Sequence, residues 1–183
     1  MPTVEQDWDY FLEGIAVLET YLLSEDVYWP LPGPTSAMPR LTIGGLLLAE
    51  IRLRSQMDGP DFLRVDQKME HIRSKWQSAW ERKAGREVKT RLDLWRNYLV
   101  EFQDSPERYV DVYPQEVRWR VMLHLLNKEV VFKPAESDAL AALDVVLKSF
   151  FVPGNFLWKP ELTSSFPMNE YWYLYGRIKH DRT

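Results

Sequence analysis

Few side chains in this sequence have the type and spacing that catalysis or metal binding requires. The three histidines, His71, His124 and His180, stand far apart, and none has a second histidine or a carboxylate three or four residues away. His124 lies within the apolar run 121–126, so we interpret it as a packing residue, with a general base or metal ligand as the alternative. His71 falls on the polar side of its segment, where we expect it to be solvated.

Three carboxylates recur at helical spacing near the N-terminus. Glu5, Asp9 and Glu13 are each four residues apart and would share one helix face. Such a group can hold a divalent cation or act as acid and base only if it is buried and has a ligand from another helix. We therefore expect a solvated face.

Several classes of site are excluded by missing residues. The chain has no cysteine, which excludes disulfides, zinc ribbons and thiol nucleophiles. It also has no Gly-x-Ser-x-Gly elbow, no Walker loop and no Gly-x-Gly-x-x-Gly motif. Gly44 and Gly45, at an expected helix start, could bind an anion through free backbone N–H groups, although two glycines also occur together for steric reasons alone. We identify no catalytic residue and predict no metal and no cofactor.

The pattern with the clearest geometry is a row of basic residues, which we call the basic ridge. On a helical wheel of residues 61–104 its members fall within about 80° of one another, nearly opposite the apolar positions. The ridge consists of Arg64, Lys68, Lys75, Arg82, Arg86, Lys89 and Arg96.

Three interpretations of the basic ridge remain open. It is a solvated helix face, a contact for an acidic protein surface, or a surface that tracks the phosphates of a nucleic acid or another polyanion. The net charge of the chain is only -4, but residues 1–50 hold one basic residue against eight acidic ones. This acidic N-terminal third is a candidate partner for the ridge, within the chain or across a dimer.

Aromatic residues are abundant, at 14% of the chain, and several lie beside prolines. Most are expected to fill the core or anchor loops, but Tyr and Trp are also enriched in binding hot spots. The aromatic candidates for a pocket or a subunit contact are Tyr28, Trp29, Trp76, Trp80 and Trp172.

The elements that must position these residues are mostly helices. Thr3 and Gln6 fit a capping box for a helix over 4–23, and Thr42 can cap a second helix that runs to residue 53. The segments 114–130 and 135–151 also have helical apolar spacing. Proline-rich stretches near 26–40 and 152–167 predict irregular structure, and 171–176 fits either a short helix or a strand.

The central segment 61–104 has no proline and only one glycine, Gly85. As one helix it would be about 66 Å long, well beyond the diameter of about 40 Å expected for a compact chain of this length. Its apolar stripe also turns by roughly 120° around the axis. Either the helix bends near Gly85, or its two halves pack against different neighbours, one of which could be a second subunit.

These patterns predict an all-α, or mainly α, single domain spanning residues 1–183, with five to six helices around a long central helix that is either straight or bent. The first nine residues are acidic and no apolar run reaches about 18 residues, so we expect a cytoplasmic protein without membrane contact. A chain of 183 residues that is 45% hydrophobic can bury a stable core without disulfides or a structural metal.

Three functions compete. The leading hypothesis is a non-enzymatic interaction or scaffold protein that forms a homodimer through the central helix and the aromatic loops, with an acidic protein as a possible partner. The second is a nucleic-acid or polyanion-binding protein that uses the basic ridge. The third is an enzyme or small-molecule binder with a pocket under the 26–40 loop.

Overall fold

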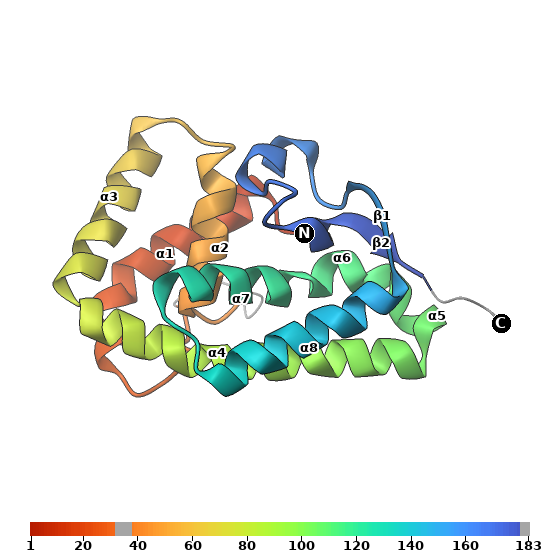
Figure 1. Cartoon of the computed structure of the whole chain (residues 1–183). Helices are drawn as coiled ribbons and strands as arrows, with labels where there is room; N and C mark the ends of the chain where they lie inside the picture. Colours follow the sequence, from red (N-terminus) through yellow and green to blue (C-terminus); the bar gives the residue numbers. More distant parts are fainter. Residues whose placement is uncertain (32–37, 180–183) are drawn as a thin grey trace.

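The computed structural model describes residues 1–31 and 38–179, and this part is a mainly helical single domain, as predicted (Figure 1). Within it, six helices have 12 residues or more. They are α1 (Val4–Leu23), α2 (Ile43–Arg54), α3 (Pro60–Lys75), α4 (Gln77–Asp104), α7 (Arg118–Glu129) and α8 (Pro134–Phe150).

Short elements connect and follow these helices. The turn between α4 and α7 contains α5 (Pro106–Tyr109), η1 (Val110–Val112) and α6 (Tyr113–Glu116). After α8 come β1 (Phe151–Phe156), η2 (Pro160–Ser165), η3 (Trp172–Leu174) and β2 (Tyr175–Ile178). No helix in the described ranges is both long enough and apolar enough to span a membrane.

The first two helices begin where their caps predict. The Thr3 hydroxyl accepts the Gln6 N–H at 3.1 Å, and the Gln6 side chain accepts the Thr3 N–H, which completes the capping box. The Thr42 hydroxyl accepts the Gly45 N–H at 3.0 Å. Capping by residues of these types stabilises a helix by about 1 kcal/mol each.

The central segment is two helices, and the break is not at Gly85 but nine residues earlier. Trp76 has φ of -116° and ψ of 33°, which ends α3 and begins α4. Gly85 lies inside the continuous helix α4. Of the two alternatives, the bend near Gly85 is therefore wrong. The packing of the two halves against different neighbours accounts for the turning stripe, because α3 packs on α1, whereas α4 packs on α7 and α8.

The core lies around α4, which runs along one side of the molecule with α7 and α8 beside it (Figure 1). Its buried positions Trp80, Ala84, Val88, Leu92 and Trp95 follow the spacing seen in the sequence. α3 turns sharply away from α4 at the break and lies beside α1, while α2 packs between α1 and α7 (Figure 1). α2 and α4 thus both pack against α7 and also contact one another.

The proline-rich segments are only partly irregular. The segment near 152–167 contains most of β1, which pairs with β2 in an antiparallel two-stranded sheet, and it also contains η2. The run 171–176 holds both η3 and the start of β2, so neither single alternative describes it. In the first segment, Trp29 and Leu41 form an antiparallel bridge, and residues 32–37 lie outside the described part.

Candidate functional site

The break at Trp76 divides the basic ridge between two helices. Arg64, Lys68 and Lys75 lie on α3, and the other four members lie on α4. All seven side chains are exposed. Because α3 and α4 run in different directions, the single straight row expected on one helical wheel is not formed (Figure 1).

Part of the ridge is neutralised within the chain. Lys75 pairs with Glu19 at 3.2 Å, and Arg86 pairs with Glu25 at 2.7 Å. Both acids belong to the acidic N-terminal third. The hydrogen bond and charge of Arg86 lower the pKa of the exposed Glu25. Arg64 and Arg96 pair with acids on their own helices, and no ion pair is found within the described ranges for Lys68, Arg82 or Lys89.

The aromatic candidates do not form one surface. Trp80 is buried and donates its Nε1–H to Glu129, while Trp76 stands at the helix junction. Trp172 packs edge-on against Phe151. Trp29 holds its loop through the bridge to Leu41 and packs near Tyr21. Trp80 lines a hollow of about 260 Å³ beside Arg73 and Glu129, whereas Tyr28 lines a larger pocket between α1, α2 and α7.

This pocket has a volume of about 610 Å³, within the range typical of small-molecule sites. Its wall is built from the first turns of α1, the segment before α2, α2 itself, α4 and the start of α7. We call it the arginine pocket, because four of its lining residues are Arg40, Arg52, Arg91 and Arg118.

Arg52 reaches the arginine pocket from α2 and is nearly buried. Its Nη2 donates to Asp7 Oδ1 of α1 at 2.8 Å, but its buried Nε–H has no acceptor among the described residues. Burial lowers the pKa of Arg52 against the opposing effect of Asp7, and nearby Arg118 lowers it further. Burial likewise raises the pKa of Asp7 although Arg52 opposes this. The pair is therefore desolvated and incompletely satisfied.

Arg91 of α4 is held by internal partners. Its Nε donates to Glu87 Oε1 at 2.7 Å, and its Nη2 donates to the Thr42 hydroxyl at 2.8 Å. The other oxygen of Glu87 accepts the Gly44 N–H at 2.9 Å. The Gly45 N–H is bonded to Thr42. The Gly44-Gly45 donors expected for an external anion are thus already used, and a buried carboxylate of the chain occupies that place.

Arg118, the first residue of α7, is the arginine with the weakest acidic partner of these three. Its nearest carboxylate is that of Glu116, at 4.0 Å. The Arg118 guanidinium lies 4.2 Å from the centre of the Trp119 ring, and that of Arg91 lies 4.7 Å from the same ring. Burial lowers the pKa of Arg118, Glu116 opposes this, and the positive charge of Arg91 lowers it further. The guanidinium of Arg118 is therefore partly desolvated, and the distant Glu116 only partly compensates for this.

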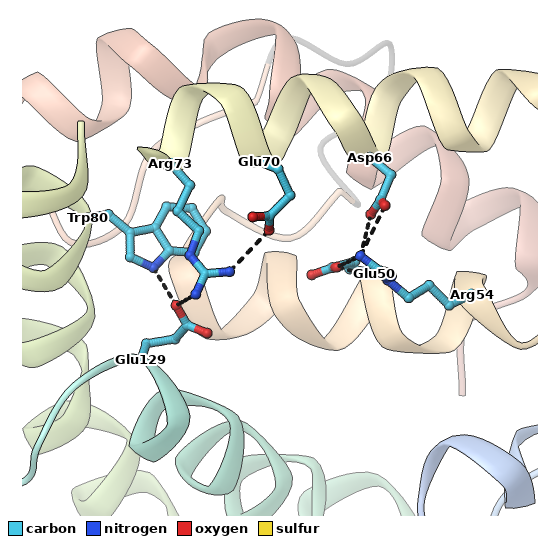
Figure 2. Close-up of polar contacts among 7 residues, drawn as sticks. All are labelled: Glu50, Arg54, Asp66, Glu70, Arg73, Trp80 and Glu129. Carbon is cyan, nitrogen blue, oxygen red and sulfur yellow. Dashed lines mark hydrogen bonds and ion pairs between the residues drawn. The ribbon is translucent and has the colours of Figure 1, made fainter. Parts of the chain in front are cut away.

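Another group of charges ties α2 to α3 (Figure 2). Arg54 donates to Glu50 Oε1 at 2.7 Å and to both oxygens of Asp66 at 3.0 Å. Burial raises the pKa of Glu50 to about 7 despite Arg54, and the negative charges of Asp66 and Glu70 add to the rise. This group joins two helices and leaves its arginine shared between two acids.

The same interface continues toward α7 in Figure 2. Arg73 of α3 pairs with Glu70 at 3.0 Å and with Glu129 at 2.8 Å. Glu129 also accepts the Trp80 Nε1–H at 2.9 Å. Each carboxylate here has an arginine partner, so we interpret the cluster as a structural tie between helices.

The remaining hollows and side chains have fewer features of a functional site. A hollow of about 670 Å³ lies between α5 and β2, but its charged lining residues are all exposed, so it lacks a desolvated charge. They are Glu107, Asp111, Arg177 and Lys179. His124 packs against Tyr171, with ring centres 4.4 Å apart. In the part of the chain that the structure describes, no group of three or more acidic or histidine side chains is placed to hold a metal ion.

Comparison with known proteins gives no relative. No family model matches the chain, and neither the curated proteins nor the solved structures include a match. The site therefore has to be interpreted from its own chemistry.

Of the residues that line the arginine pocket, sequence reasoning singled out Tyr28, Asp9 and Gly45 but missed Arg52, Arg91, Arg118 and Trp119. One signal was available. Arg52 falls in an apolar run of α2, and Arg91 lies beside Leu92 in the buried face of α4. A charge at such a position has to meet a partner or a pocket.

Proposed function

We propose that this protein binds a small organic anion in the arginine pocket. The observation that carries the proposal is the placement of Arg52, Arg91 and Arg118, from three different helices, around one pocket of about 610 Å³. Guanidinium groups are the donors best matched to carboxylates and phosphates.

The charges around the pocket are unequally paired. Asp7 forms an ion pair with Arg52, and Glu87 forms one with Arg91, whereas the nearest carboxylate to Arg118 is 4.0 Å away. Arg40, on the segment before α2, is exposed and has no ion pair among the described residues. The pocket therefore retains positive charge that an anion would neutralise, and Arg118 is its main anchor.

The rest of the wall favours an organic body attached to the anionic group. Leu48 and Met122 supply apolar surface, and the rings of Tyr28 and Trp119 supply flat faces. Binding sites of this size are usually apolar with a few placed polar groups. A bare inorganic anion would leave this apolar surface uncovered, so we expect it to bind more weakly.

The proposal is tested by titrating the protein with phenylpropionate, an anion with an apolar ring, in an isothermal calorimeter. Arg118→Gln removes the anchoring charge. Loss of one charged hydrogen bond is expected to weaken binding by about tenfold or more. Arg108→Gln is the matched control, because Arg108 is also exposed and also lies over the neighbouring ring, of Tyr109, but outside the pocket.

Two results would oppose the proposal. The first is that phenylpropionate at millimolar concentration gives no heat of binding. The second is that Arg118→Gln and Arg108→Gln both bind it as tightly as the unchanged protein. In either case the pocket does not bind organic anions.

A further inference from the structure

The arginine pocket also has an acidic side. Its two acidic lining residues in the described ranges, Asp7 and Asp9, both come from α1, whereas its arginines come from α2, α4, α7 and the segment before α2. The acidic residues of the pocket wall thus come from one helix and its basic residues from other elements, although Asp7 and Arg52 pair with each other.

The two carboxylates differ in how they are used. Asp7 is buried and accepts the hydrogen bond of Arg52. Asp9 is exposed, and within residues 1–31 and 38–179 it has neither a hydrogen bond nor an ion pair from its side chain. Asp9 therefore keeps its accepting capacity for a group that enters the pocket.

The charge that a ligand can carry follows from this division. The first two residues of α7, Arg118 and Trp119, line the basic side, whereas the start of α2 already holds the Glu87 carboxylate. Asp9 faces an incoming anion with a like charge, which disfavours a ligand that is only negative. A ligand with a positive group near Asp9 removes this repulsion.

We infer that the ligand is dipolar: a small molecule with an anionic group bound by Arg118 and a protonated amine bound by Asp9, joined through an apolar body. A free amino acid with an apolar or aromatic side chain has this chemistry. The inference rests on the proposed function, because it adds a second contact to the same pocket.

The test compares three compounds that share a phenyl ring: phenylalanine, phenylpropionate and phenylethylamine. In calorimetry on the unchanged protein, we expect phenylalanine to bind about tenfold more tightly than phenylpropionate, because it makes one more charged hydrogen bond. Phenylethylamine should bind most weakly. Asp9→Asn should remove the advantage of phenylalanine and leave phenylpropionate bound equally well or better. Asp58→Asn is the control, because Asp58 is exposed and lies outside the pocket.

The outcomes separate the two claims. If phenylpropionate binds through Arg118 but phenylalanine binds no better and Asp9→Asn changes neither affinity, the dipolar ligand is overturned and the proposed function stands. If neither acid binds, the proposed function fails and this inference fails with it. If Asp58→Asn has the same effect as Asp9→Asn, the advantage reflects overall charge and the role of Asp9 is overturned.

Discussion

Glu87 illustrates how one buried side chain organises the residues around the pocket. Its carboxylate is fully buried, accepts the Gly44 N–H at the start of α2, and holds Arg91 in place. A helix start of this kind binds anions readily, and here an internal carboxylate does so. In the proposed function, Arg118 is therefore the arginine that receives an external anion. No sequence motif signals this arrangement, because residues 44 and 87 lie on different helices.

Glu50 should make stability depend on pH. Its pKa is about 7 in the folded protein, above the usual 4.5, so the folded state holds the proton more tightly than the unfolded state. The free energy of unfolding should therefore rise as the pH falls from above 7 toward 4.5. Above pH 7, Glu50 is charged in the folded protein, and the full unfavourable free energy of burying that charge is present. Glu50→Gln removes that cost and should raise the melting temperature at pH 8 but hardly at pH 5.

The matched control for Glu50 is Glu101→Gln, because Glu101 is exposed on α4. It should leave the pH profile unchanged. A loss of stability in Glu50→Gln that is as large at pH 8 as at pH 5 would show that Glu50 does not change its charge between these pH values, which contradicts its raised pKa.

Residue 45 has to be a glycine because side-chain atoms, rather than backbone atoms, lie close to it. A methyl group at this position would stand 2.5 Å from the Tyr10 hydroxyl oxygen. Gly45→Ala should therefore cost about 1–3 kcal/mol in the free energy of unfolding. In a Tyr10→Phe background the hydroxyl is absent, so the cost should shrink. Denaturant unfolding of the four proteins measures it, and equal costs in both backgrounds would refute the contact.

At the scale of elements, the helices with local signals could be predicted from the sequence. The caps Thr3 and Thr42 fixed the starts of α1 and α2, and the proline-rich stretches marked where helices end. The break at Trp76 could not be predicted, because neither proline nor glycine marks it. It depends on α3 packing against α1, a tertiary contact that includes the Phe11 and Phe62 rings, 6.1 Å apart.

Gly85 provides a direct test of the continuous α4. A methyl group there meets no atom within 4 Å, and its backbone is helical. Gly85→Ala should raise the free energy of unfolding by up to about 1 kcal/mol, because alanine favours a helix over glycine. Chemical denaturation measures this change. A clear loss of stability would indicate that the helix bends at this glycine after all.

At the scale of the whole molecule, the acidic N-terminal third was a candidate partner for the basic ridge. The acidic N-terminal third meets the basic ridge through Glu19 and Glu25, so part of the charge separation is resolved internally. The pocket could not be predicted beyond its place near the 26–40 loop, since its arginines come from helices far apart in sequence.

Self-association stays a prediction, and the structure suggests which face to test. The outer face of α8 exposes Ala141, Ala142 and Val145, the last at 70%. Burial of an apolar side chain of this size contributes roughly 1.5–3 kcal/mol. Light scattering coupled to gel filtration should give the mass of a dimer, and Val145→Asp should give that of a monomer. A strict monomer for the unchanged protein at micromolar concentration would exclude the dimer.

The arginine pocket is the central claim, and the position of a bound ligand tests it most directly. In a crystal structure of the protein with phenylpropionate, we expect the carboxylate within hydrogen-bond distance of the Arg118 guanidinium and the ring against Trp119 and Met122. Ligand density on the exposed face of Arg82 and Lys89, with the pocket empty, would contradict the account.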